Sequence, residues 1–261
     1  MTAIFLTTAC FVLAYMTAWF VASRIAERND IADVAWGLGF ILAAAVSLVA
    51  GGHCAPRGFL ASLLVLVWGV RLALHIHARN RGKGEDPRYR QWREEWGRWF
   101  VLRSFLQVFM LQGVLLVLVA VPVIFINASP PTPFGWQDGL GLLIWLTGFT
   151  FEAVGDWQLL RFISNPANRG KLMTSGLWRY TRHPNYFGEV TLWWGIWLMA
   201  LSIPGGAWTV IGPLAITLLI LKVSGIPMLE KGYEGRADFA AYRRRTSAFF
   251  PLPPRKPEGE S

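Results

Sequence analysis

Paired polar side chains stand at the ends of long apolar stretches, and their spacing could serve ligand binding. Glu152 and Asp156 are four residues apart, as are Asn185 and Glu189. Residues at i and i+4 are neighbours on one face of a helix. Ionisable groups inside membrane-spanning helices are costly and usually mark function. The two pairs therefore indicate polar faces that could surround a ligand.

Further polar residues lie at the same ends of neighbouring stretches. They are Asp30, Asp33, Arg71, His75, Gln107, Gln112 and Lys222. Helix ends can be polar simply because they reach the lipid headgroups, which would account for Asp30 and Lys222. It accounts poorly for the short side chains of Glu152 and Glu189, which lie about a turn or more inside. The pattern predicts a shared polar cavity that opens to the cytosol.

The elements that must position these residues are apolar helices. The chain has 261 residues, of which 54% are apolar, and a spanning helix needs about 20 such residues. Seven stretches qualify: 4–22, 31–50, 59–76, 105–126, 140–154, 186–203 and 208–226. We predict an all-α bundle of seven transmembrane helices, with one domain over 1–250. The Pro-rich, charged segment 251–261 is expected to be a disordered tail.

Positive charge alternates along the connections and predicts the topology. Eight Lys and Arg lie in 78–103, five in 158–185 and seven after 226, whereas other connections carry few or none. The positive-inside rule then places the N-terminus outside and the C-terminus in the cytosol. Because the net charge of +9 is located in these loops, we do not expect nucleic-acid binding. No metal site is expected, since two cysteines form no CxxC and four histidines form no ligand set.

The two most basic cytosolic loops suit a multiply charged anion, because guanidinium groups clamp phosphates. Attraction to anionic lipid headgroups is the alternative, and composition alone favours it. The sequence contains neither a Walker A motif nor a GxGxxG motif. A nucleotide would therefore not be held by a P-loop or a Rossmann turn.

The run GLWRYTRHPNYFGE, residues 176–189, resembles the signature of the membrane steroid 5α-reductase family in its bacterial branch. The wider superfamily includes sterol reductases and isoprenylcysteine carboxyl methyltransferases. The resemblance extends over about 30–251 and includes the closing AYRRRTSAFFP. It implies a seven-helix fold and NADPH-dependent reduction of an activated C=C bond. It also implies a steroid-like lipid substrate. We further expect a monomer in a bacterial inner membrane, with the cofactor site facing the cytosol because the polar zone and two basic loops lie on that side.

The resemblance assigns cofactor contacts residue by residue. Asn185 and Glu189 match the family's Asn-x-x-x-Glu at the nicotinamide end, and Glu152 and Asp156 fall near the nicotinamide amide and ribose. Tyr242 matches a C-terminal Tyr that packs at the nucleotide. The other predicted cofactor contacts are Asn80, Arg81, Lys83, Arg88, Tyr89, Lys171, Arg179, Tyr180, Arg182 and His183. Among these, Arg88 and Tyr89 belong to a segment, EDPRY, whose role the resemblance leaves open.

The predicted catalytic residues are Asp33, Trp68, Arg71 and Glu189. Asp33 falls at the position of the family's acid near the substrate carbonyl; alternatively it is a helix N-terminal acid stabilised by the dipole. Animal enzymes carry a Tyr three residues before the helix-three Arg, where this chain has Trp68 before Arg71. An indole N–H donates a hydrogen bond but cannot relay a proton as a phenol can.

Two other functional classes remain open at this point. An S-adenosylmethionine-dependent methyltransferase is one, because that branch shares the HPNYFGE element. S-adenosylmethionine carries no phosphate, so Arg169, Lys171, Arg179 and Arg182 favour NADPH. A transporter is the other, but its polar groups would be expected near the midplane and along both routes.

Overall fold

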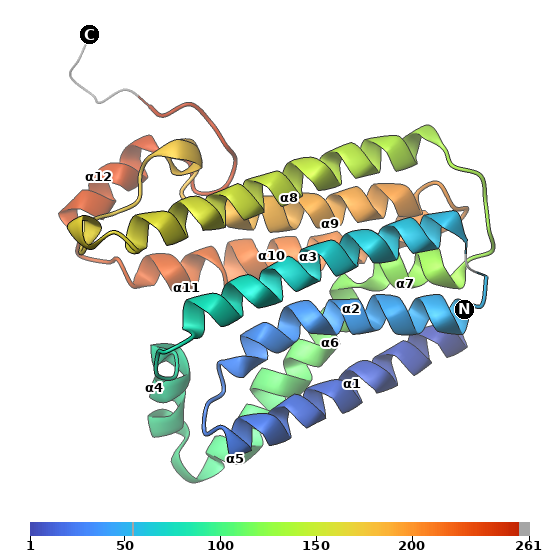
Figure 1. Cartoon of the computed structure of the whole chain (residues 1–261), viewed down its shortest axis with the longest axis horizontal. Coiled ribbons are helices and arrows are strands. Elements are labelled where there is room, and N and C mark those ends of the chain that lie inside the picture. Colours follow the sequence, from blue (N-terminus) through green and yellow to red (C-terminus); the bar gives the residue numbers. More distant parts are fainter. Residues whose placement is uncertain (54, 256–261) are drawn as a thin grey trace. The chain divides into compact units, whose positions relative to one another are not determined.

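The computed structural model describes residues 1–53 and 55–255, whose regular structure is helical apart from one isolated bridge between Thr181 and Ser247 (Figure 1). Among these residues, five helices are long and apolar enough to cross a membrane. The protein is therefore an integral membrane bundle of helices, and the predicted all-α class is confirmed. The helices over 140–154 and 186–203 lie outside this set of five, so the count of seven spans stays a prediction.

Two compact units make up the chain. The first contains residues 1–137 and 199–212, and the second contains 138–198 and 213–261. Residue 54 and residues 256–261, which include most of the predicted disordered tail, lie outside the described residues. Within the rest of that tail, the backbone N–H groups of Leu252 and Arg255 donate to the carbonyls of Tyr180 and Arg245, at 3.0 and 2.9 Å. Residues 251–255 are thus ordered against the second unit.

The first unit is built on α1 to α7. Their bounds are α1 (Thr2–Ile25), α2 (Ile31–Gly51), α3 (Pro56–Asn80), α4 (Pro87–Trp96), α5 (Phe100–Arg103), α6 (Leu111–Val119) and α7 (Val121–Ala128), with η1 (Gly97–Trp99), the π-helical η2 (Ser104–Met110) and η5 (Gly206–Val210). Glycines let α2 and α3 pack closely, because a Cβ on Gly69 would lie 2.7 Å from the carbonyl oxygen of Gly37. On α7, Asn127 Nδ2 donates to Ser47 Oγ on α2 and Ser62 Oγ on α3, at 2.9 and 3.1 Å.

Two stretches of the first unit differ from expectation. The connection 78–103, expected as a charged loop, contains α4, because Asp86 caps the helix and Pro87 occupies its first position. The predicted helix 105–126 ends at Ala120 and restarts as α7. Pro122 lies in the first turn of α7, where its missing N–H is tolerated, whereas inside a continuous helix it would remove a hydrogen bond.

The second unit contains α8 (Trp136–Ile163), η3 (Pro166–Asn168), η4 (Gly176–Arg179), α9 (Pro184–Ala200), α10 (Ile211–Leu218), η6 (Leu219–Val223), α11 (Ile226–Lys231) and α12 (Ala237–Arg245). A glycine seam joins α8 and α9, which lie side by side in Figure 1. A Cβ on Gly148 would lie 2.5 Å from the Leu192 nitrogen, and one on Gly188 would lie 2.4 Å from the Glu152 nitrogen. The seam therefore places the polar ends of these two helices against each other.

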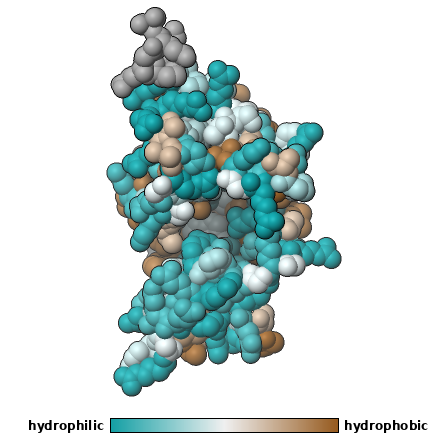
Figure 2. All heavy atoms as spheres, turned by 90° about the vertical axis from the view of Figure 1, so that its left-hand side faces the viewer, coloured by the Kyte–Doolittle hydropathy of each residue, from teal (hydrophilic) through white to brown (hydrophobic). Residues whose placement is uncertain are grey.

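In each unit, one end of the helices is hydrophilic. That end carries α4 in the first unit and α12 in the second, and Figure 2 shows mostly hydrophilic side chains over both. Large apolar side chains are exposed elsewhere on the helices, as for Phe11 at 55% and Leu143 at 61%. Exposed apolar flanks and a hydrophilic end are what a lipid-embedded helix bundle requires.

Candidate functional site

The facing ends of α8 and α9 bring four predicted cofactor residues into one region of the second unit. Asn185 Nδ2 donates to Asp156 Oδ1 at 3.1 Å. Glu152 lies one turn before Asp156 and is 2% exposed, and Glu189 lies one turn after Asn185. The i,i+4 pairing seen in the sequence thus becomes contact between two helices.

The amide oxygen of Asn185 is the most unusual atom of this region. Asn185 Oδ1 is buried and has no hydrogen-bond partner among the described residues. Leaving a buried acceptor unpaired costs about 1–3 kcal/mol. The amide nitrogen is already used by Asp156, so the oxygen is the acceptor of this side chain that remains available.

Arg182 and His183, both predicted cofactor contacts, are paired with Glu230 of α11. Glu230 Oε1 lies 2.8 Å from Arg182 Nε and 3.1 Å from His183 Nε2. Arg182 Nη1 also donates to the carbonyl of Thr246 at 2.5 Å. These contacts join the two residues just before α9 to α11 and to Thr246, which directly follows α12. Glu230 was not predicted, and nothing in the sequence signals a partner 47 residues away.

An arginine-lined pocket lies on the second unit near α12, with a volume of about 400 Å³. Its lining residues are Thr174, Arg179, Tyr242, Arg245, Thr246, Pro254 and Arg255. The lining contains three guanidinium groups and no carboxylate. Arg179 and Tyr242 were predicted from the sequence. Arg245 was not, because three consecutive arginines give no sign of which one faces a pocket, and Arg255 was not, because it lies in the segment expected to be a disordered tail.

The Tyr242 phenol fixes one wall of this pocket. It donates to the carbonyl oxygen of Trp178, whose indole Nε1 donates to the Gly155 carbonyl at 3.1 Å. Burial raises the pKa of Tyr242 above its usual value, so its phenol stays protonated and remains a donor. Lys171 and Tyr180 are exposed and do not line the pocket.

In the first unit, Asp33 near the start of α2 meets α4. Tyr89 Oη donates to Asp33 Oδ1 at 2.8 Å, and Arg88 Nη2 lies 3.4 Å from Oδ2. The Asp33 side chain keeps 19% of its surface exposed, whereas Tyr89 keeps only 5%. The structure thus brings three predicted site residues together.

Asp86 holds the start of α4 beside this pair. Its Oδ1 accepts from the Arg88 backbone N–H at 2.9 Å and from Arg88 Nε at 3.0 Å. Burial acts to raise the pKa of Asp86, but these hydrogen bonds and the charges of Arg88 and Arg79 outweigh it and hold the pKa below its usual value. The residue is thus an ionised helix cap.

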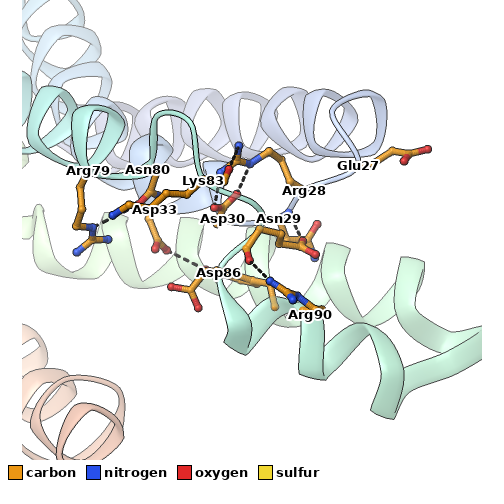
Figure 3. A network of polar contacts seen from close by, with 12 residues as sticks. Glu27, Arg28, Asn29, Asp30, Asp33, Arg79, Asn80, Lys83, Asp86 and Arg90 are labelled. Atoms are coloured by element: carbon orange, nitrogen blue, oxygen red, sulfur yellow. Dashed lines mark hydrogen bonds and ion pairs between the residues drawn. The ribbon is translucent and has the colours of Figure 1, made fainter. Parts of the chain in front are cut away.

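Further polar contacts hold the connection before α4 and the residues just before α2 (Figure 3). Glu85 Oε1 accepts from the Asn29 backbone N–H at 2.7 Å and from Arg93 Nη2 at 3.0 Å. Arg28 binds Asp30 through two parallel bonds of 2.7 Å, which is the strongest geometry for such a pair. The carboxylates of Asp30 and Glu85 are thus paired with arginines of the same unit.

The other predicted residues of the first unit lie on α3 and just after it. Trp68 is fully buried, and its ring packs edge-on to Phe40 with centroids 5.3 Å apart. Arg71 lies one turn later and is half-buried. At the last residue of α3, the Asn80 side-chain oxygen accepts from Arg79 Nε at 3.3 Å. Arg81 and Lys83, which follow α3, are exposed.

With this geometry described, the chain can be compared with known proteins. The sequence pattern of a family described as "Protein of unknown function (DUF1295)" matches residues 19–246. The chain belongs to this family. The DUF1295 match includes every predicted site residue, from Asp33 to Tyr242.

Partial similarity links this DUF1295 chain to curated proteins named 3-oxo-5-alpha-steroid 4-dehydrogenase 1. It is 36% identical to the Homo sapiens protein over 69 residues, which are 26% of each chain. It is 38% identical to the Bos taurus protein over 71 residues, which are 27% of each chain. The chain thus covers about a quarter of the length of these relatives. No solved structure matches the chain.

Proposed function

We propose that the protein is an NADPH-dependent reductase that acts on the C=C bond of an α,β-unsaturated ketone in a steroid-like lipid. The unpaired Oδ1 of Asn185 carries the proposal. The arginine-lined pocket of the second unit and the partial similarity to 3-oxo-5-alpha-steroid 4-dehydrogenases support it. We place the protein in a bacterial inner membrane, as a monomer, with the cofactor site facing the cytosol.

The residues of the second unit fit the cofactor chemically. The carboxamide of a nicotinamide presents N–H donors, and Asn185 Oδ1 is a buried acceptor that lacks one. The phosphates of NADPH are multiply charged anions, and Arg179, Arg245 and Arg255 line a pocket without a carboxylate. The role assigned to Glu152 and Asp156 is to orient the nicotinamide end, with Asp156 fixing the Asn185 amide.

The chain's own residues handle charge and protons in this chemistry. When bound, NADPH supplies the hydride for the β-carbon of the enone. Negative charge then develops on the carbonyl oxygen, and a preorganised donor there lowers the barrier. We assign this donor to the Asp33 region of the first unit, where a carboxyl group can hold a proton for the product.

A lipophilic substrate can reach such a protein from the bilayer. The exposed apolar side chains of the helices provide a lipid-facing surface. A steroid-like enone dissolved in the membrane therefore needs no aqueous route, whereas the cofactor needs the hydrophilic end. Entry of the substrate from the bilayer and of the cofactor from the cytosol agrees with the predicted topology.

Isothermal titration calorimetry with NADPH, followed by turnover of a 3-oxo-Δ4 steroid, tests the proposal on the full chain in detergent. We expect saturable NADPH binding and loss of NADPH absorbance only when the steroid is present. A folded sample that binds no NADPH would overturn the function.

The alternative function, an S-adenosylmethionine-dependent methyltransferase, can be tested with the same sample. Thermal shifts with NADPH and with S-adenosylmethionine are compared at matched concentrations, since a ligand stabilises the state that binds it. Selective stabilisation by S-adenosylmethionine would replace the reductase by a methyltransferase.

A further inference from the structure

A row of aromatic rings runs from α4 to α5, beside the end of α1, in the first unit. The rings of Trp92 and Trp96 stack with centroids 5.3 Å apart, and the Trp96 centroid lies 6.2 Å from that of Phe100. α1 reaches the same place, because the ring of Phe20 lies 5.1 Å from that of Phe105 in η2 (Figure 1). Side chains of α1, η1 and α5 can therefore meet at this row.

Three guanidinium groups from these three segments lie over aromatic rings of this region. The guanidinium carbon of Arg24 on α1 is 5.8 Å from the centroid of Phe100, and that of Arg103 on α5 is 6.0 Å from the centroid of Trp96. Arg98 of η1 lies 5.4 Å from the centroid of the tryptophan that follows it. A cation within about 6 Å of a ring centroid is attracted to the ring. The aromatic side chains thus gather three positive charges, which we call the arginine corner.

The arginine corner differs from the neighbouring charges in having no carboxylate partner. Arg93 of the same region is bound to Glu85 at 3.0 Å. Among the described residues, by contrast, no carboxylate forms an ion pair with Arg24, Arg98 or Arg103. All three side chains are exposed. They can therefore bind an anion without first breaking an ion pair.

The sequence places two of these arginines at the boundary between apolar and charged segments. Arg24 is the first charged residue of the chain, and Arg103 is the last one before a stretch without charge that runs to Asp138. Both residues belong to candidate membrane spans, α1 and Pro87–Val119. Basic side chains at the ends of spanning helices reach the level of the lipid headgroups. In the predicted topology this end lies in the cytosolic leaflet, whose surface is negatively charged.

Large apolar side chains are exposed next to the three arginines. Ile25, which follows Arg24 on α1, is 81% exposed. Trp99, Val101 and Leu102, which lie between Arg98 and Arg103, are each about half exposed. A soluble anion would contact only the cations of such a surface, whereas a phospholipid would also place its acyl chains against the apolar side chains.

We propose that the arginine corner is a binding site for an anionic phospholipid. The lipid phosphate lies against the guanidinium groups of Arg24, Arg98 and Arg103, which can each donate two parallel hydrogen bonds to it, and the acyl chains lie along α1 and α5. A zwitterionic headgroup carries its own positive charge and is attracted less. The inference is independent of the proposed reductase, because none of these arginines was assigned to the cofactor or the substrate.

The variant that tests the site combines Arg24→Gln, Arg98→Gln and Arg103→Gln in the full chain. Native mass spectrometry in detergent compares the binding of phosphatidylglycerol and phosphatidylcholine with identical acyl chains. We expect the wild type to bind one phosphatidylglycerol about 10-fold more tightly than phosphatidylcholine, as for the gain of a charged hydrogen bond. The triple variant is expected to bind both lipids equally. Its melting temperature, compared with that of the wild type, shows whether folding is retained.

A charge-matched control separates a defined site from the overall positive charge. Lys231→Gln, Arg243→Gln and Arg244→Gln remove three exposed cations from α11 and α12 of the second unit. We expect this control to keep the preference for phosphatidylglycerol. If the control loses the preference as the corner variant does, or if the corner variant keeps it, the arginine corner is not a lipid site.

Photo-crosslinking gives a second measurement that needs no variant. A phosphatidylglycerol with a diazirine in its acyl chain is bound to the wild type in detergent, and the labelled peptides are identified after digestion. We expect labels at the end of α1 and in α5, next to Ile25 and Leu102. Labels spread evenly over the apolar helices would overturn the proposal.

A competition experiment distinguishes a lipid from a soluble anion. Inorganic phosphate and glycerol 3-phosphate carry the same charged group without acyl chains. We expect neither to displace phosphatidylglycerol at equal concentrations. Displacement by either compound would show that the corner binds a soluble phosphate, and the lipid assignment would be wrong.

Discussion

The network around α4 in the first unit and the pocket near α12 in the second unit differ in how their charged side chains are paired. In the first unit, the carboxylates of Asp33 and Glu85 are held by Arg88 and Arg93 of the same unit, at 3.4 and 3.0 Å. In the second unit, the arginines around the pocket face a cavity of about 400 Å³ without a carboxylate in its lining. One set of charges is neutralised internally, and the other is left for a ligand.

This difference separates two kinds of arginine that composition cannot distinguish. Arg182 of the second unit is 7% exposed and is paired with Glu230 at 2.8 Å, so it belongs to the internally neutralised kind. Arg245, on the exposed side of α12, faces the pocket. A guanidinium without a carboxylate partner can bind an anion without first breaking an ion pair. The contrast therefore predicts where substitutions change binding and where they change stability.

The largest expected effect comes from the α8–α9 region, where the second unit leaves an acceptor unpaired. Asn185→Ala and Glu189→Gln are each expected to abolish reduction, by about 1,000-fold or more, because the nicotinamide end loses its orientation. The rate of NADPH consumption with a 3-oxo-Δ4 steroid measures this. Asn168→Ala is the control, since its amide donates to the Phe162 carbonyl outside the site. If both variants turn over like the wild type, the nicotinamide placement is wrong.

The seam that positions these residues is tested by two glycines of α8. Gly148→Ala would put a Cβ 2.5 Å from the Leu192 backbone nitrogen, whereas Gly139→Ala meets no atom within 4 Å. We expect Gly148→Ala to destabilise the second unit by about 1–3 kcal/mol. Gly139→Ala should be neutral or slightly stabilising. Melting temperatures in detergent give the comparison, and equal values would show that α8 and α9 do not approach so closely.

Much of the helical framework could be predicted from the sequence, because each apolar stretch is long and any charged residue in it lies near one end. The sequence predicted one polar face with Asp156 and another with Asn185, but not the contact between them. Spacing of i,i+4 shows which residues share a helix face, and it does not show which helix lies opposite. The glycines at 148 and 188 supply that information only once the helices are paired.

The charged segment 78–103, which contains α4, illustrates what could not be predicted. Its many arginines suggested a loop, but Asp86 and Pro87 start a helix there and Arg93 reaches back to Glu85. The contact of Tyr89 with Asp33 spans 56 residues and follows from the rotation of a short helix, which periodicity does not determine. Arg245 was missed for the same reason, since which of the three arginines 243–245 faces the pocket depends on how α12 packs.

Neighbouring arginines of α12 offer a smaller and sharper test of the comparison. Arg245 lines the pocket and Arg244 does not. We expect Arg245→Ala to weaken NADPH binding about 10-fold, as for the loss of one charged hydrogen bond, and Arg179→Ala to raise the KM for NADPH. Arg244→Ala should leave the affinity unchanged. Calorimetric Kd values that rise equally in Arg244→Ala and Arg245→Ala would mean that the positive charge of the helix acts without a defined pocket.

The smallest expected effect is a pH dependence confined to the first unit. Because the pKa of Asp86 is held below its usual value, its ionised form favours the folded start of α4. That contribution is complete above the ordinary carboxyl pKa of about 4 and is lost as the pH falls through the lowered value. Fluorescence of Trp92 and Trp96, both on α4, can follow the loss in acid titrations. Asp86→Asn should remove this part of the pH dependence.

Asp238 of the second unit provides the matched comparison for that titration. Its pKa is also lowered, through a hydrogen bond from Arg236, but 52% of its side chain is exposed. Solvent screens an exposed pair, so Asp238→Asn should change the acid titration less than Asp86→Asn does. If Asp238→Asn has the larger effect, the paired charges of the first unit do not hold α4. The fixed position of Tyr89 would then need another explanation.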